Sequence, residues 1–214
     1  MTEDEVVREI QRLVAAGEYL DSMRGVPGVC LDGPGTFVGN QREYVRGSPE
    51  YLEARAAGLI ETLPPLAPAT RETIEVAERE CGYPLPALLR RLYLEVGNGG
   101  FGPGYGIFSL PLGKEHKTWR SLPPSLLPVC DWGCGISSFV DCADAEVRMW
   151  GWDPNPAPHD DLNKALFRED VTLCQWLTRW VSGEIYQPVL VQDPESGTWR
   201  GASHEEKAAW MNEP

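Results

Sequence analysis

The spacing of hydrophobic residues changes part-way along the chain, and this change limits the fold class more than any other feature. In several segments before Gly97 they recur every three to four positions, which is the period of an amphipathic helix. After Gly106 they fall into short runs separated by Gly, Pro and Asp, which is typical of strands joined by turns. Helices gathered first and strands gathered later predict an α+β fold.

Six helices are predicted from this period and from residues that cap helix ends. A capping box at Thr2 and Glu5 begins the first helix, and Gly17 ends it. Thr70 is expected to cap a later helix, Asp170 the helix that carries two Trp residues, and Ser203 a short C-terminal one. The expected ranges are 3–16, 49–60, 71–81, 85–96, 173–181 and a last helix from 204.

The remaining segments predict strands, loops and a boundary. Residues 25–47 are rich in Gly and Pro, so we expect loops there, with room for one short strand. Strands are expected at 107–110, 126–130, 136–141, 146–152 and 189–192. The Pro-rich connector 63–68 is stiff, because each Pro fixes φ. We therefore predict an N-terminal helical extension, 1–62, packed on a main α+β domain, 63–214.

The charge of the chain limits its partners. There are 32 Asp plus Glu against 19 Lys plus Arg, a formal net charge of −13. This surplus argues against direct binding of DNA or RNA, whose phosphates require clustered cations, and favours a basic partner. No apolar stretch reaches the roughly 18 residues that a membrane span needs. The acidic N-terminus lacks the pattern of a signal peptide, so we expect a cytoplasmic protein whose six Cys are reduced.

Several patterns resemble catalytic or metal-binding motifs, but each has a simpler explanation. Gly97 to Gly102 fits the letters of a dinucleotide-binding loop, yet a helix precedes it where a strand is required. Cys130, Cys134 and Cys142 have spacings found in zinc sites, but a fourth ligand is missing. Cys134 between two Gly, or the run 159–161 (His-Asp-Asp), leaves an enzyme as an alternative. We predict no catalytic residues, no metal and no cofactor.

One window combines acidic and aromatic residues. The sequence from Asp131 to Asp161 contains seven acidic residues and one basic residue, Arg148. The chain also has eight Trp, a residue type enriched both in cores and at binding hot spots. A well-solvated face is the simpler interpretation of the acids, and a surface for a basic protein is the functional one. The predicted partner-binding residues are Asp131, Trp132, Asp144, Glu146, Trp150, Trp152, Asp153, His159, Asp160 and Asp161.

Several short motifs resemble the SUKH superfamily, also called the Smi/Knr family. They are the helix 74–78, Tyr-Pro-Leu-Pro at 83–86, Leu-Tyr at 92–93, the Asn-Gly-Gly run 98–106, Asp-Trp-Gly-Cys-Gly at 131–135, the strand 147–152 and the closing helix 173–181. The resemblance covers roughly residues 66–183. It implies a mainly antiparallel sheet flanked by helices. The long segment before residue 66 and the tail after 183 depart from the pattern.

For bacterial members the resemblance implies an immunity role, in which the protein binds and neutralises a toxin. The family shares no catalytic residue set, so none is transferred to this chain. We therefore expect a protein that neutralises a basic toxin domain through the acidic surface at 131–161. A regulatory or scaffold protein with a partner other than a toxin is the alternative. The sequence does not determine the oligomeric state.

Overall fold

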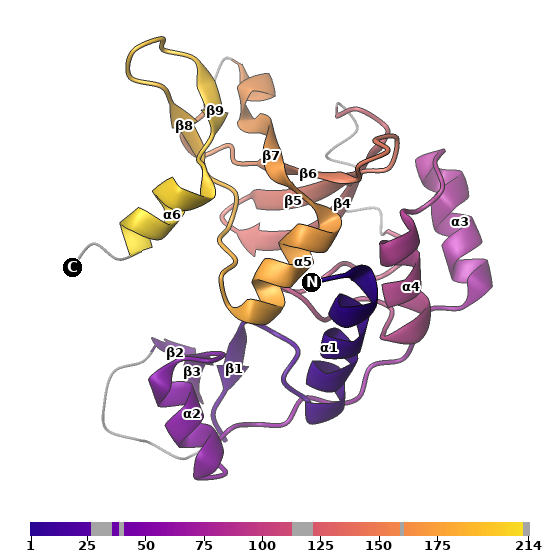
Figure 1. The fold of residues 1–214 in the computed structure, drawn as a ribbon, viewed down its shortest axis with the longest axis vertical. Coiled ribbons are helices and arrows are strands. Elements are labelled where there is room, and N and C mark those ends of the chain that lie inside the picture. The colour runs from indigo at the N-terminus through magenta and orange to yellow at the C-terminus, as the bar shows by residue number, and fades with distance from the viewer. Residues whose placement is uncertain (27–35, 39–40, 113–121, 159–160, 212–214) are drawn as a thin grey trace.

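The computed structural model describes residues 1–26, 36–38, 41–112, 122–158 and 161–211, with the backbone alone for 36–38 and 211. The described residues form an α+β fold (Figure 1). Its helices are α1 (Glu3–Ala16), α2 (Pro49–Ala56), α3 (Arg71–Cys81), α4 (Ala87–Glu95), α5 (Leu173–Ser182) and α6 (His204–Met211), with a 3-10 turn η2 (Leu162–Ala165). Its strands are β1 (Ser22–Arg24), β2 (Thr36–Val38), β3 (Gln41–Val45), β4 (Leu126–Gly133), β5 (Ile136–Asp141), β6 (Arg148–Trp152), β7 (Leu166–Thr172), β8 (Leu190–Gln192) and β9 (Trp199–Gly201).

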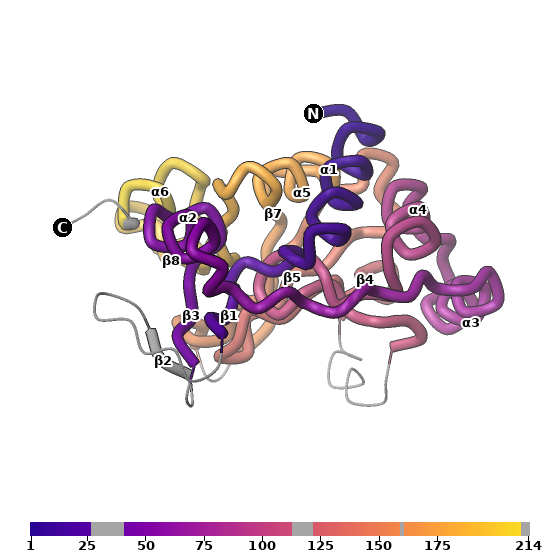
Figure 2. The backbone as a smooth tube through the Cα atoms, turned by 90° about the horizontal axis from the view of Figure 1, so that it is seen from below, coloured from indigo at the N-terminus to yellow at the C-terminus, as the bar shows by residue number. Residues whose placement is uncertain are grey.

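The centre of the fold is an antiparallel sheet in the order β4-β5-β6-β7. Val140 of β5 lies opposite both Leu127 of β4 and Met149 of β6, and all three are buried. Because side chains alternate along a strand, this row faces one side of the sheet. Figure 2 shows α1, α4 and α5 on that side. The main core therefore lies between these helices and the sheet.

Helix α1 belongs to this main core. Thr2 and Glu5 form the predicted capping box, and Val6, Ile10 and Leu13 are buried against the cluster that contains α5 and α4. Gly17 ends α1 with φ of 69°, and a Cβ there would lie 2.5 Å from Thr62 Cγ2. A residue without a side chain is needed at this position both for the backbone angle and for the close approach.

The segment after α1 is more ordered than the sequence suggests. The prediction of loops over 25–47 is wrong in part, because two strands, β2 and β3, lie there and form a three-stranded antiparallel sheet with β1, which comes just before this segment. A small second core of Met23, Tyr44, Tyr51 and Ala54 joins this sheet to α2. Arg46 links this unit to α5, since its guanidinium donates to the Trp180 carbonyl at 3.0 Å and lies 5.2 Å from the Trp180 ring centroid.

Four other expectations need correction. Residues 107–110 make a single bridge, from Ile107 to Cys130, so no strand forms there. Strand β7 was not predicted, because its charged residues hide the alternation of buried positions. Helix α5 is capped by Thr172, which forms a capping box with Gln175, and Asp170 lies within β7. Helix α2 ends at Ala56, four residues before the expected end.

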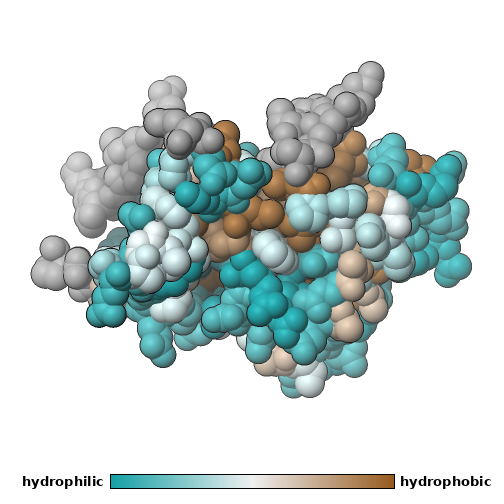
Figure 3. All heavy atoms as spheres, turned by 90° about the horizontal axis from the view of Figure 1, so that it is seen from above, coloured by the Kyte–Doolittle hydropathy of each residue, from teal (hydrophilic) through white to brown (hydrophobic). Residues whose placement is uncertain are grey.

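The surface in Figure 3 shows hydrophobic residues gathered across the middle of one side of the molecule and hydrophilic residues towards both ends. Scattered apolar residues remain exposed, including Leu52, Tyr105 and Trp210. Apolar atoms always contribute a large share of a folded surface, so single exposed residues need no special explanation. None of the described helices combines the length and the apolar character that a membrane crossing requires.

Candidate functional site

The structure divides the predicted partner-binding residues between the two ends of the β5–β6 hairpin. Asp131 and Trp132 end β4, and Asp153 follows β6, so they lie at the end where Ser137 pairs with Trp152. The turn that carries Asp144 and Glu146 joins β5 to β6 at the opposite end. Five residues of β6 separate the two ends, which is about 17 Å at roughly 3.4 Å per residue. The acidic window is therefore two surfaces.

The turn between β5 and β6 holds its acidic side chains around one cation. Asp144 accepts hydrogen bonds from the Glu146 N–H at 3.0 Å and from Arg148 Nη1 at 3.1 Å, and Glu146 also pairs with Arg148. These interactions, the backbone N–H first, lower the pKa of Asp144. The Glu146 side chain is 62% exposed and the Asp144 side chain 21%. Glu146 thus has the more accessible carboxylate of the two, with its charge partly balanced by Arg148.

The backbone of this turn is strained. Val147 has φ of 53°, in the left-handed region that β-branched residues rarely adopt. Its N–H donates to the Asp144 carbonyl, and its carbonyl accepts from Leu173 N–H at the start of α5, both at 2.9 Å. Such strain costs on the order of 1–3 kcal/mol and tends to occur where a precise geometry is needed. Here it fixes the position of Glu146 relative to α5.

A groove with acidic side chains adjoins this turn. It has a volume of about 200 Å³ and is lined by Glu3 of α1, Leu88 of α4, Glu146 and Val147 of the turn, and Cys174 of α5, among others. We call this feature the acidic groove. Its apolar walls and two carboxylates suit a Lys or Arg side chain, whose stem is apolar and whose head is charged.

At the other end of the hairpin, Asp153 requires a correction. This residue is 4% exposed, so its carboxylate is not available to a partner. One oxygen accepts from Leu190 N–H at 3.0 Å, and the other accepts from the backbone N–H of Asn155 at 3.1 Å and from Asn155 Nδ2 at 3.0 Å. Asp153 therefore fastens β8 to the end of β6, and it is no longer part of the candidate surface.

The remaining acids at this end differ in accessibility. Asp131 accepts from Gly133 N–H at 2.7 Å and is partly exposed. Asp161 precedes η2, and its side chain is 40% exposed, 3.5 Å from Lys164. His159 and Asp160 lie outside the described residues. The role of these residues in partner binding stays a prediction.

The three Trp residues of the predicted surface are packed against the protein. Trp132 meets Trp176 edge-on, with ring centroids 6.5 Å apart, and its Nε1 donates to Ser138 at 2.9 Å. Trp152 packs against the small core under β8 and β9. Trp150 buries its indole nitrogen, which has no hydrogen-bond partner within the described part of the chain. All three remain partly exposed, so only part of each side chain is accessible to a partner.

The cysteines considered for zinc or nucleophilic chemistry lie in different surroundings. Cys130 is fully buried, and burial raises its pKa. Cys134 is exposed in the turn between β4 and β5, with φ of 51°. Cys142 contacts Cys81 of α3, and its S–H hydrogen bond lowers the pKa of Cys81 to about 7. Among the residues that the structure describes, no group of three or more metal-ligating side chains is suitably arranged.

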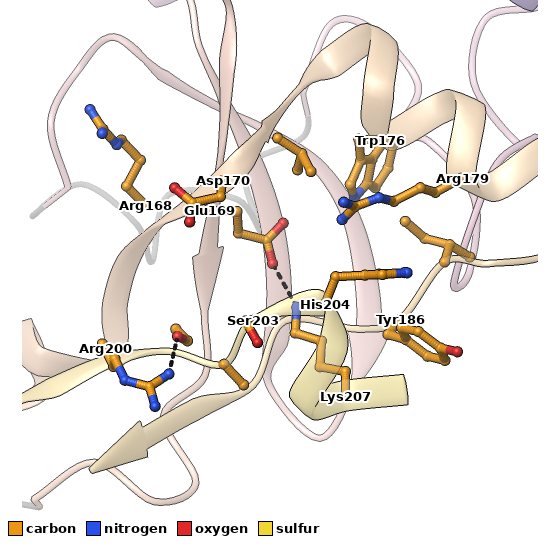
Figure 4. Close-up of a pocket in the computed structure, with 14 residues that line it drawn as sticks. Arg168, Glu169, Asp170, Trp176, Arg179, Tyr186, Arg200, Ser203, His204 and Lys207 are labelled. Carbon is orange, nitrogen blue, oxygen red and sulfur yellow. Dashed lines mark hydrogen bonds and ion pairs between the residues drawn. The ribbon is translucent and has the colours of Figure 1, made fainter. Parts of the chain in front are cut away.

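The sequence reasoning missed a cavity in the C-terminal part of the fold (Figure 4). It has a volume of about 220 Å³ and lies between β7, α5, β9 and the start of α6. Lys207 of α6 and Glu169 of β7 form an ion pair across it at 3.2 Å, and both side chains are about nine-tenths buried. Arg200 is held by Glu206 through two contacts, at 2.7 and 2.8 Å. This pairing is the first reason why the pKa of Glu206 is lowered to about 2.

A scan against protein families places part of this architecture. Residues 68–166 match the SMI1 / KNR4 family (SUKH-1). The chain carries a SUKH-1 domain. A comparison with curated proteins and one with solved structures gave no match. The SUKH superfamily membership predicted from the short motifs is thus confirmed, together with the α+β fold.

The SUKH-1 match runs from just before α3 to the first residue of β7. It includes the strained turn and the acidic residues of both hairpin ends. Helices α1 and α5, which complete the acidic groove, lie outside the matched range, as does every residue that lines the C-terminal cavity. The sequence did contain a signal for that cavity: basic residues at 168, 179, 200 and 207 stand out in a strongly acidic chain. Their wide spacing concealed their proximity.

Proposed function

We propose that the chain is an immunity protein that acts in the cytoplasm, where it binds a cognate toxin and blocks it by steric and electrostatic contact. Three observations support this proposal: the SUKH-1 domain, the net charge of −13 and the acidic groove. The groove carries most weight, because it supplies both shape and charge for a basic side chain of the partner. Complementary charge speeds association and disfavours wrong partners.

The proposed contact centres on the end of the hairpin that carries Glu146. There the carboxylates of Glu3 and Glu146 both line the acidic groove. The strained backbone at Val147 holds the turn against α5. Asp144 assists by fixing Arg148, which keeps the turn in shape. The surface at the other end, with Asp131, Trp132, Trp150, Trp152 and Asp161, is retained as a second possible contact area.

The test is a growth-rescue assay in which the protein is co-expressed with the toxin domain encoded by the neighbouring gene. We expect Glu146→Lys to weaken binding, measured by calorimetry, by roughly tenfold or more, because close charge pairs at interfaces contribute on the order of 1.5 kcal/mol or more. Glu53→Lys on α2 makes the same change of charge at an exposed site remote from the groove and should have little effect.

Asp161→Lys distinguishes the two ends of the hairpin. If Asp161→Lys weakens toxin binding and Glu146→Lys does not, the contact lies at the opposite end of the hairpin, and the role of the groove is refuted. Binding without rescue of growth would favour the regulatory or scaffold alternative. Absence of binding to the neighbouring gene product would remove the support for an immunity role.

A further inference from the structure

The C-terminal cavity is separate from the acidic groove, and its charge has the opposite sign. Its charged lining comprises four cations, Arg168, Arg179, Arg200 and Lys207, and two acids, Glu169 and Asp170. Lys207 is neutralised by Glu169, and Arg200 by Glu206. In an acidic protein this local surplus of cations requires an explanation.

Among the described residues, Arg168 and Arg179 are the two lining cations without an anionic partner, and of these Arg179 lies against the interior of the cavity. It extends from α5 beside Trp176, which is 1% exposed and forms a wall of the cavity (Figure 4). Within the described residues its guanidinium makes no ion pair and no hydrogen bond. A partly buried guanidinium is most stable when a planar carboxylate or a phosphate accepts from its N–H groups. Asp170 lies at the rim and is exposed, and Arg168 points away from the cavity.

His204 at the start of α6 experiences the field of Arg179. Burial, followed by the charge of Arg179, lowers the pKa of this imidazole, and Lys207 acts in the same direction. Glu184 and Glu205 act against them without reversing the shift. The ring also lies 5.2 Å from that of Tyr186. The N-terminal end of α6, capped by Ser203, adds the positive end of a helix dipole to the same side.

The size of the cavity limits what can enter. Its volume of about 220 Å³ is below the roughly 300–1,000 Å³ of pockets that hold drug-sized ligands and cofactors. It is several times the roughly 30 Å³ that one water molecule occupies. A single small acid group fits these limits, whereas a nucleotide does not.

We propose that this cavity is a binding site for a small oxyanion, a carboxylate or a phosphate, held between Arg179 and His204. Arg179 donates in the plane of the anion, and protonated His204 donates from the α6 side. Tyr186 and Trp176 limit the access of water. The site goes beyond the proposed immunity function and does not depend on it.

The test follows the His204 imidazole by NMR in the full chain, with His204→Gln to assign the resonance. Inorganic phosphate and glutarate are titrated separately, and sodium chloride at matched ionic strength is the control. Saturable binding of either anion should raise the pKa of His204, because a bound anion favours the charged ring. Affinity should therefore fall as the pH rises through that pKa. Which of the two anions saturates the site identifies whether its chemistry is that of a phosphate or of a carboxylate.

Two variants with the same change of charge decide whether Arg179 is responsible. Arg179→Gln should weaken binding by about tenfold or more, since it removes the charge-assisted contacts. It should also raise the pKa of His204 in the protein without anion. Arg168→Gln, at the rim of the same cavity, should leave both the anion affinity and the pKa of His204 unchanged. The proposal would be overturned if both variants lost anion affinity equally. It would also be overturned if phosphate and glutarate shifted the pKa of His204 no more than sodium chloride does. A thermal melt of each variant verifies that the fold is retained.

Discussion

Replacing Asp153 by Ala should destabilise the protein rather than remove a partner contact. The substitution deletes the acceptor for three N–H groups, one on Leu190 and two on Asn155. Leu190 is 3% exposed, so its N–H would stay buried without a partner. Asn155 is exposed, and its donors can turn to water.

The magnitude follows from this difference. An unsatisfied buried donor costs about 1–3 kcal/mol, and hydrogen bonds to a charged acceptor contribute about 1.5–3 kcal/mol. Because the Asn155 donors recover most of their loss, we expect the free energy of unfolding to fall by about 3 kcal/mol for Asp153→Ala. Asp153→Asn keeps an acceptor for Leu190 but brings its NH₂ towards other donors, so about half of that loss is expected.

The assay is urea unfolding followed by Trp fluorescence, in which the shift of the midpoint multiplied by the slope m gives the change in stability. Asp161→Asn is the matched control, because this carboxylate is partly exposed at the same end of the sheet and should change stability by less than about 0.5 kcal/mol. If Asp153→Ala unfolds within about 0.5 kcal/mol of the wild type at the same m, the fastening role of this carboxylate is refuted.

Three other predictions test the packing, the buried ion pair and the thiol contact. Ile10→Ala should lower the stability to urea by about 2–5 kcal/mol, because the residue is fully buried in the main core; a loss below about 1 kcal/mol would mean that α1 is peripheral. Lys207→Met should cost about 3–5 kcal/mol in the same assay by stranding Glu169, and adding Glu169→Leu should restore most of it; no recovery would contradict the ion-pair argument. Alkylation of Cys81 by iodoacetamide, followed by mass spectrometry, should accelerate as the pH rises through about 7, and Cys142→Ala should move this midpoint towards that of an ordinary thiol; an unchanged midpoint would exclude the contact as its cause.

The helices were predictable because their signals are local. α1, α3 and α5 combine a hydrophobic stripe with a capping residue and a Gly stop, and each of them forms close to the expected range. Three short strands were not predictable. β1, β2 and β9 have three residues each, which is too few to show an alternation of hydrophobic and polar residues. Strand β7 was hidden by charged residues that face solvent or the C-terminal cavity.

The candidate site was predictable in residue type and not in arrangement. The sequence identified Glu146 and Asp161 as acids of one window, but β6 carries the chain from one end of the sheet to the other between them. It could not show that Glu3, far away in the chain, shares a groove with Glu146. Nor could the sequence show that the Asp153 side chain is buried, because its burial depends on β8 packing beside the end of β6.

The packing of α1 against α5 has a consequence for how the protein is made. The apolar stripe of α1 is synthesised long before α5, which follows the whole central sheet, although α4 is made earlier and covers part of the stripe. At about 5–20 residues per second the helix waits roughly 8–30 s for α5. During translation the nascent chain therefore exposes part of the apolar surface of α1 until α5 is made, and chaperones bind surfaces of this kind. A chain truncated before α5 would lack the helix that completes the main core and would leave that core exposed to solvent.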